Sequence, residues 1–159
     1  MKLTGPCLWF ASQALEAAEY YVSLFDDSRI VEVLHYPGSG PMPAGTVLMV
    51  RFVVNGQPMM ALNAGPAFSF NPAVSMVVEC SNQAEVDSLW ARLGEGGAPS
   101  QCGWLADRYG LSWQVVPTAM LDMLRSPDSA AANRAMVAMM GMVKLDIATL
   151  QAAFNNNPN

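Results

Sequence analysis

Hydrophobic and polar residues follow one another along the chain in an order that occurs twice. In the first half, residues 3–10 suit a strand, and apolar residues at helical spacing follow Ser12, a residue able to cap a helix. Residues 30–36 alternate like a strand, and Asn55-Gly56 between two apolar runs is typical of a type I′ hairpin. These patterns predict a strand, a helix and up to three strands before residue 64.

The second half repeats this order with little residue identity to the first. The pattern predicts a strand over 73–80 and a helix over 81–93, with Ser81 or Asn82 as its cap. Short strands are expected on either side of a turn at Tyr109-Gly110. One helix covers only one face of such a sheet, so two paired units would enclose a concavity suited to a ligand.

Helical patterns replace this order after Pro117. Ser126-Pro127-Asp128 interrupts them, and KLDIATLQAAF (144–154) predicts a further amphipathic helix. Met136, Met139, Met140 and Met142 crowd the intervening stretch, as is typical of a core or a subunit interface. The expected single α+β domain has three parts, at residues 1–63, 73–117 and 118–159.

Composition and charge narrow the classes of partner. The net charge is −5 with a pI of about 4.6, so nucleic acid and anionic membranes are not expected partners. No apolar run approaches the roughly 20 residues that span a bilayer, and we expect a cytoplasmic protein. Charged residues make up only 13% of the chain, which indicates that a partner subunit covers apolar surface. Cys7, Cys80 and Cys102 form no disulfide or zinc pattern and are interpreted as free thiols.

The aromatic residues are the main candidates for a binding site. Trp9, Trp104 and Trp113 suit the wall of a cavity for an apolar molecule, and they equally suit a core. Phe68 and Phe70 lie in the expected linker at 64–73, either as core plugs or as a lid over the cavity. Their spacing alone does not decide between these alternatives.

Polar candidates are few. Gln114 and Asn63 could supply the contacts that orient a ligand, and Cys102 is expected on a strand facing the concavity. A nucleophilic cysteine needs a neighbouring base or cation, and no histidine can be placed there, so a buried thiol is favoured. Asp107 and Arg108 fit either a substrate-binding pair or, preferably, a turn-stabilising salt bridge.

Several segments in order resemble PhnB-like proteins: PCLWF, AAEYYVSLF, GQPMMALNAGP, NQAEVDSLW and CGWLADRYGLSWQVVP. These proteins form a branch named 3-demethylubiquinone-9 3-methyltransferase within the glyoxalase/bleomycin resistance/dioxygenase group, the vicinal oxygen chelate superfamily. The resemblance extends over nearly the whole chain, including the KLDIATLQAAF ending. It implies two βαβββ modules of the glyoxalase/bleomycin resistance-like fold with a helical C-terminal tail, and a homodimer. A glycine-rich strand–loop–helix that would hold S-adenosylmethionine is not evident.

Metal-dependent members of this superfamily hold a divalent ion through His or Glu side chains on inward-facing strands. The resemblance places these residues at or near the four ligand positions: Pro6 or Cys7, Ser75, Gln114, and Ala61 or Asn63. Proline and alanine offer no side-chain ligand, and neutral Ser and Gln are weak ones. The single histidine, His35, is expected on the second strand as a surface or structural residue. We therefore expect no catalytic metal and no other cofactor.

The sequence predicts a protein that binds a small, largely apolar molecule in a Trp-lined cavity without a metal. A sequestering or sensing protein without turnover and the methyltransferase of the family name are the alternatives. The sequence does not separate an enzyme from a binding protein, identify catalytic residues, or show whether modules pair within or between chains. The expected ligand-binding residues are Trp9, Asn63, Phe68, Cys102, Trp104, Trp113 and Gln114.

Overall fold

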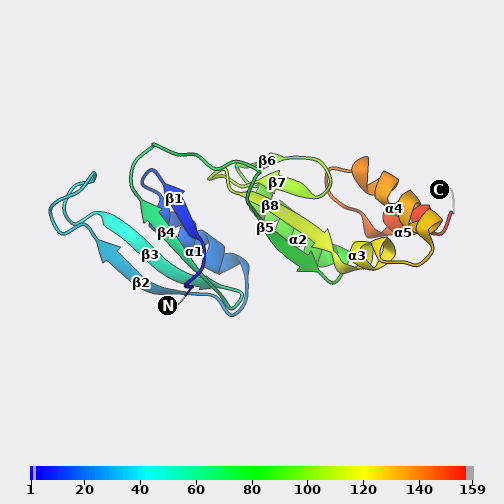
Figure 1. Ribbon diagram of the computed structural model, residues 1–159, viewed down its shortest axis with the longest axis horizontal. Helices are drawn as coiled ribbons and strands as arrows, with labels where there is room; N and C mark the ends of the chain where they lie inside the picture. Colours follow the sequence, from blue (N-terminus) through cyan, green and yellow to red (C-terminus); the bar gives the residue numbers. More distant parts are fainter. Residues whose placement is uncertain (2, 157–159) are drawn as a thin grey trace. The chain divides into compact units, whose positions relative to one another are not determined.

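The chain forms two compact units, each built on its own four-stranded sheet (Figure 1). The computed structural model describes Met1 and residues 3–156, with Met1–Phe70 in unit 1 and the rest in unit 2. Each unit has the order strand, helix and three strands, and a helical tail follows in unit 2. The α+β fold with two βαβββ modules and a helical tail is therefore confirmed.

Unit 1 has a mixed sheet in the order β1-β4-β3-β2, in which β1 is parallel to β4. Its elements are β1 (Cys7–Phe10), α1 (Ala14–Leu24), β2 (Arg29–His35), β3 (Val47–Val54) and β4 (Gln57–Asn63). Asn55 and Gly56 join β3 to β4 with φ of 46° and 76°, the left-handed values that a type I′ turn requires. The hairpin predicted at this pair is confirmed.

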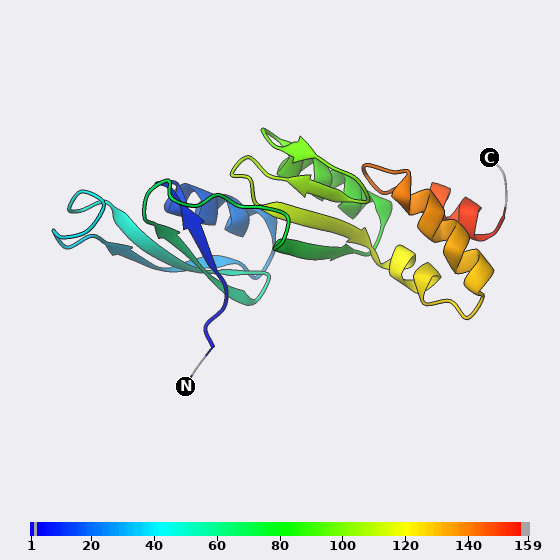
Figure 2. The same ribbon diagram turned by 45° about the horizontal axis from the view of Figure 1, so that its top comes forward.

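One face of the unit 1 sheet packs against α1 (Figure 2). Every second residue of β3 from Val50 onward, and of β4 from Met59 onward, is buried there. The helix contributes three alanines with no exposed surface, and their small side chains allow its backbone to approach the sheet. These alanines are Ala14, Ala17 and Ala18.

A side chain from β4, rather than Ser12, caps α1. The residue before the helix is Gln13, whose side chain makes no capping bond. Asn63 instead accepts a hydrogen bond from the Ala14 N–H through Oδ1 at 2.8 Å, and its Nδ2 donates to the Val47 carbonyl at 3.0 Å. The expectation that Ser12 caps the helix was wrong, because the cap comes from a residue 49 positions away in sequence.

Unit 2 has the sheet order β5-β8-β7-β6, with β5 parallel to β8. Its elements are β5 (Ser75–Cys80), α2 (Gln83–Gly94), β6 (Ala98–Pro99), β7 (Trp104–Ala106) and β8 (Ser112–Pro117). Of the two candidate caps, Asn82 is the one that accepts from the Glu85 N–H, at 2.9 Å. The β8 side chains that alternate with Gln114 pack against α2.

The tail consists of α3 (Thr118–Leu124), α4 (Ser129–Met140) and α5 (Ile147–Phe154). The break at residues 126–128 is confirmed, and Asp128 caps α4 by accepting from the Ala130 and Ala131 N–H groups. Asp146 caps α5, so this helix begins at Ile147 and not at residue 144 as predicted. Within the described residues, no helix is both long and apolar enough to cross a membrane.

The tail has its own small core. Buried residues of the three helices gather with Val116 at the end of β8 and Leu145 before α5. The core residues are Val116, Met120, Met123, Ala135, Leu145 and Leu150, and Met139 and Met142 pack against them. Two of the four crowded methionines therefore contribute to a core, whereas Met136 and Met140 are exposed.

The segment between α4 and α5 fastens this core to the second module. The Met142 carbonyl accepts from the Cys102 N–H at 2.7 Å, and that of Val143 accepts from the Gly103 N–H at 2.8 Å. The Leu145 side chain is fully buried beside Gly103. The backbone of the tail is therefore hydrogen-bonded to the turn that precedes β7.

Candidate functional site

The helix-free face of the unit 1 sheet has a continuous row of apolar side chains. Trp9 pairs with Leu62, Leu62 with Met49, and Met49 with Leu34 across the four strands. These residues alternate with the buried ones that face α1, so they point to the opposite side. Strand alternation was visible in the sequence, but the row was missed because it depends on the pairing register.

A second row on the same face ends in charge. Cys7 pairs with Met60, Met60 with Arg51, and Arg51 with Glu32. The Arg51 guanidinium lies 3.4 Å from the Glu32 carboxylate, and both side chains are nearly half exposed. The face is thus apolar beside β1 and β4 and charged toward β2.

Two aromatic side chains meet at the Trp9 end of this face. The Trp9 Nε1–H donates to the Gly65 carbonyl at 2.8 Å, which fixes the indole against the linker. The Phe68 ring contacts the indole edge-to-face, with centroids 5.0 Å apart and planes at 81°, and Phe68 remains 68% exposed. Phe70 instead packs on the buried Phe10 at 5.3 Å. Of the two linker phenylalanines, Phe70 is the plug and Phe68 lies over Trp9.

The helix-free face of the unit 2 sheet contains a half-buried tryptophan, Trp104. Trp104 on β7 pairs with Gln114 on β8. The Gln114 Nε2 donates to the Ser75 Oγ at 2.9 Å, and Val77, which pairs with Gln114, is 58% exposed. Ser75 and Gln114, placed at ligand positions by the family resemblance, therefore lie together and bond to each other.

Trp113 and Asp107 belong to the core and not to this face. Trp113 is 2% exposed, and its Nε1–H donates to the buried Asp107 carboxylate at 2.8 Å. The other Asp107 oxygen accepts from the N–H groups of Tyr109 and Leu111. Arg108 donates to Glu95 at 3.0 Å. Asp107 therefore stabilises the turn before β8, and Trp113 is a core residue.

Cys102 is not where the sequence placed it, and the thiols of Cys7 and Cys80 have raised pKa values. Cys102 lies in a turn with φ of 60° and not on a strand as predicted, since β7 begins two residues later. Burial raises the pKa of the Cys7 thiol, and burial followed by the nearby Glu85 raises that of Cys80. A raised pKa keeps these thiols protonated at neutral pH.

The β4 position of the possible metal site is fixed by the sheet register. Ala61 and Asn63 face α1 and are 0% and 3% exposed, so the β4 side chains on the helix-free face are Met60 and Leu62. Neither offers the nitrogen or carboxylate ligands that Zn²⁺ or Mn²⁺ prefers. In the part of the chain that the structure describes, no three His, Cys, Asp or Glu side chains gather to hold an ion. The residues present do not fit the divalent metal of this fold.

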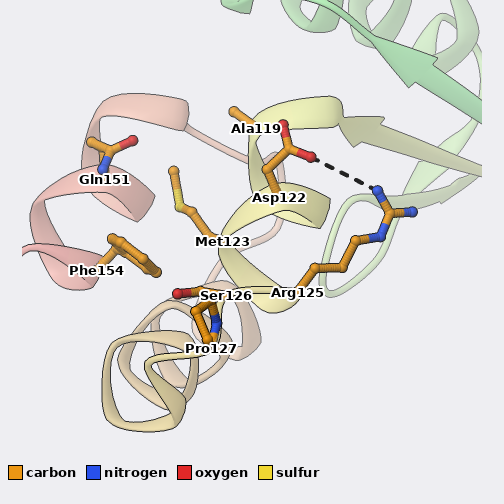
Figure 3. Close-up of a pocket in the computed structure, with 8 residues that line it drawn as sticks. All are labelled: Ala119, Asp122, Met123, Arg125, Ser126, Pro127, Gln151 and Phe154. Carbon is orange, nitrogen blue, oxygen red and sulfur yellow. Dashed lines mark ion pairs between the residues drawn. The ribbon is translucent and has the colours of Figure 1, made fainter.

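A separate hollow of about 510 Å³ lies between α3 and α5 (Figure 3). Met123 and Phe154 point into it, and Gln151 lines it from α5. Asp122 and Arg125 form an ion pair at 3.8 Å at its edge, with both side chains more than 70% exposed. Such an exposed pair contributes little binding energy, so this hollow is a weaker candidate than the two sheet faces.

Comparison with known proteins identifies the family. The family model described as 3-demethylubiquinone-9 3-methyltransferase matches residues 2–116. The chain belongs to this family. The match ends within β8, so the helical tail lies outside it, and the expectation that the likeness included the KLDIATLQAAF ending is not supported. No curated protein matches the chain.

Solved structures agree with the family assignment. A PhnB protein from Bacillus cereus, which bears the same methyltransferase name, is 36% identical with a TM-score of 0.66, covering 74% of this chain and 99% of that one. The protein PA1353 from Pseudomonas aeruginosa is 24% identical with a TM-score of 0.60, covering 74% and 98%. Both proteins therefore share the fold seen here over about three quarters of this chain.

The fold also occurs in a metal-binding protein. A FosX variant from Listeria monocytogenes, solved with Mn(II) and 1S,2S-dihydroxypropylphosphonic acid, is 11% identical with a TM-score of 0.51, covering 72% of this chain and 90% of that one. At this identity the likeness shows the fold alone. The function of this PhnB-like chain therefore has to be argued from its own side chains.

Proposed function

We propose that this protein binds a small, largely apolar molecule against the helix-free face of its unit 1 sheet, where Trp9 lies, without a catalytic metal. The observation that supports this most directly is the exposed Phe68 ring set edge-to-face on Trp9, beside the apolar row of Leu62, Met49 and Leu34. Exposed aromatic surface of this kind is costly in water, and a bound apolar ligand would cover it.

The helix-free face of unit 2, taken by itself, offers a second surface of this kind. Trp104 offers a half-buried ring, and the Gln114–Ser75 pair offers polar atoms beside it. A few polar groups in an apolar surface are typical of small-molecule sites. The roles of Asn63, Cys102 and Trp113 in this proposal are structural, since their polar atoms or rings are engaged in the fold.

The absence of a suitable ligand set supports a metal-free function. Cys7, Met60, Ser75 and Gln114 are the side chains at the corresponding positions, and they include no histidine or carboxylate. Native mass spectrometry with metal analysis of freshly purified protein should find much less than one ion per chain. Stoichiometric zinc, nickel or manganese would overturn this part of the proposal, and a co-purified organic mass would identify the ligand class.

The proposal also includes the expectation that the protein is a cytoplasmic homodimer whose cysteines are free thiols.

The binding surface can be tested with an uncharged apolar probe, N-phenyl-1-naphthylamine. The wild-type protein should bind it saturably, and Phe68→Ala should weaken binding about tenfold because one aromatic wall is lost. Leu3→Ala, which trims an exposed apolar residue that precedes β1, is the matched control and should leave the affinity unchanged. Equal affinity of wild type and Phe68→Ala would contradict the proposal.

The methyltransferase function suggested by the family name is the second candidate, and calorimetry with S-adenosylmethionine separates it. Each described sheet has a single parallel pair of strands, which differs from the doubly wound parallel sheet expected for such cofactors. We expect titration with S-adenosylmethionine to give no saturable heat of binding. Binding with a stoichiometry near one per chain would favour the methyltransferase instead.

A further inference from the structure

The outer side of the helical tail exposes an apolar surface that neither the family match nor the proposed function explains. Its side chains lie on α4 and on the loop after it, on the side of the helix opposite the buried Ala131 and Ala135. The exposed fractions are 37% for Met136, 63% for Val137, 62% for Met140 and 44% for Val143. We name these four residues the α4 patch.

A groove lies directly beside the α4 patch. Helices α4 and α5 are packed side by side (Figures 1 and 2), and a hollow of about 570 Å³ opens between them. The hollow is lined by Val137, by the three alanines Ala138, Ala152 and Ala153, and by the polar side chains of Asn133, Arg134 and Asn156. The same surface therefore contains a ridge of large apolar side chains and a groove in which small alanines lie beside a few polar side chains.

The charge of this surface favours contact with a second copy of the chain. Between residues 129 and 143, and between 147 and 156, the sequence contains one charged residue, Arg134. Its guanidinium donates to the carbonyls of Ala153 and Phe154 at the C-terminal end of α5, at 3.0 and 2.6 Å. The rest of the molecule accounts for the negative net charge of −5, which would oppose association through most other surfaces.

We propose that the α4 patch and the adjacent groove form a self-association surface, in which α4 of one copy packs in the groove of another. A two-fold contact requires a patch that is complementary to itself, and a ridge beside a groove satisfies this condition. Neither α4 nor α5 contains a carboxylate that would repel the same carboxylate of a second copy. Because this surface lies outside the family match, it is independent of any dimer that the two modules form.

Sedimentation velocity of the full chain over a wide range of concentrations tests this surface. The variants Val137→Glu and Met140→Glu place a carboxylate at the centre of the contact in both copies. Each should weaken self-association by at least about tenfold, or halve the molar mass if another interface persists. The matched control Gln151→Glu adds the same charge to α5, on the side that faces α3, and should associate like the wild type.

The outcomes are decisive because the substituted residues are exposed. Circular dichroism should show the same helix content in all variants, and the double variant Val137→Ala/Met140→Ala repeats the test without adding charge. A wild type that is monomeric at every concentration, including one that binds lipid vesicles instead, overturns the proposal. Equal association of the wild type and both glutamate variants, or equal loss in the Gln151→Glu control, overturns it as well.

Discussion

Asn63 joins three segments of unit 1 through a single buried side chain. Its Oδ1 accepts from the first N–H of α1, its Nδ2 donates to the carbonyl that begins β3, and its own carbonyl accepts from the Tyr36 hydroxyl at 2.6 Å. Only 3% of Asn63 is exposed, so water cannot replace these partners. The residue is a structural joint and explains why α1 needs no local cap.

Replacement of this joint should destabilise the protein strongly. We expect Asn63→Ala to lower the free energy of unfolding by about 2 kcal/mol, because a helix cap is lost and two buried backbone groups are left unsatisfied. Urea denaturation followed by fluorescence measures this change. Ser12→Ala, at the cap expected from the sequence, should change the stability by less than about 0.5 kcal/mol. A larger loss in Ser12→Ala than in Asn63→Ala would contradict the assignment.

Single residues also mark the limit of prediction from sequence at the candidate site. Trp9, Trp104 and Trp113 each lie on a strand, yet only the first two lie half-buried on helix-free faces. The side of the sheet that a strand residue faces depends on which element covers that side, and this is a long-range property. Asp107 likewise looked like a partner of Arg108, whereas it accepts hydrogen bonds from Trp113, Tyr109 and Leu111.

At the scale of elements, Gly103 is where the turn before β7, the strand β8 and the tail approach one another most closely. Its φ is 80°, and a Cβ added there would lie 2.9 Å from the Leu145 Cδ1 and 2.9 Å from the Val115 carbonyl oxygen. The close approach allows the Gly103 N–H to reach the Val143 carbonyl. Glycine at this position therefore determines whether the tail can dock.

Gly103→Ala should cost about 3 kcal/mol, since backbone strain at positive φ adds to overpacking against Leu145 and Val115. The control is Gly110→Ala, where φ is 85° but nothing lies within 4 Å of an added Cβ. That variant should cost only about 1 kcal/mol from the backbone alone. Thermal unfolding of both variants measures the difference, and equal losses would show that the tail does not press on Gly103.

The polar contacts of Asp87 and Asp146, which we name the clasp, predict that the stability of the folded protein depends on pH. The Lys144 ammonium and the Gln83 amide hydrogen-bond to Asp87 and lower the pKa of its carboxyl, and Thr149 lowers that of Asp146. A lowered folded-state pKa contributes stability above the ordinary value of about 3.9, and this contribution is lost as the pH falls through the folded pKa. The folded protein should therefore lose stability below about pH 4.

Asp87→Asn removes one of these carboxyls and should reduce the fall in thermal midpoint between about pH 6 and about pH 2.5. Asp122→Asn, which removes an exposed carboxyl from α3, is the matched control and should keep most of the fall. An Asp87→Asn variant whose midpoint falls as steeply as that of the wild type would contradict the role of the clasp.

The order of elements could be predicted from the sequence, whereas their attachments could not. Strand alternation, helical spacing, the Asn55-Gly56 turn and the break at residues 126–128 depend on neighbouring residues, and the elements they predict are present. Two boundaries were wrong, since β1 begins at Cys7 and not at residue 3, and α5 begins at Ile147 and not at residue 144. The cap of α1, the turn at Cys102 and the docking of residues 142–145 depend on segments that are distant in sequence. Sequence periodicity contains no information about such contacts.

At the scale of the whole molecule, the chain combines two modules of one topology with a tail that belongs to the second compact unit. The helix-free faces hold aromatic and apolar side chains where metal-dependent relatives of the superfamily are expected to hold ligands. A metal that stabilises a fold by binding only its native state raises the midpoint of unfolding. The effect of metal removal on the midpoint of unfolding therefore tests whether a bound ion stabilises the whole protein.

If the protein is metal-free as proposed, incubation with EDTA should leave the thermal midpoint unchanged within about 1 °C, because chelation then removes no stabilising ion. The measurement is differential scanning calorimetry before and after chelation, with added Zn²⁺ or Mn²⁺ as the reverse test. A fall of several degrees with EDTA that is restored by one of these ions would contradict the metal-free proposal.

The attachment of the tail affects how fragments of this protein should be designed. A polypeptide ending at residue 116, where the family match stops, would lack the segment that covers Gly103. It would also lack two hydrogen-bond partners of the Gln83 side chain, which donates to the Leu145 carbonyl at 3.1 Å and accepts from the Ile147 N–H at 2.8 Å. It would also uncover Val116, which is 7% exposed in the full chain. Such a fragment would expose apolar surface that the tail covers in the full chain, and it should aggregate on expression. The family match therefore ends inside the second compact unit, Asn71–Asn159, and not at its boundary.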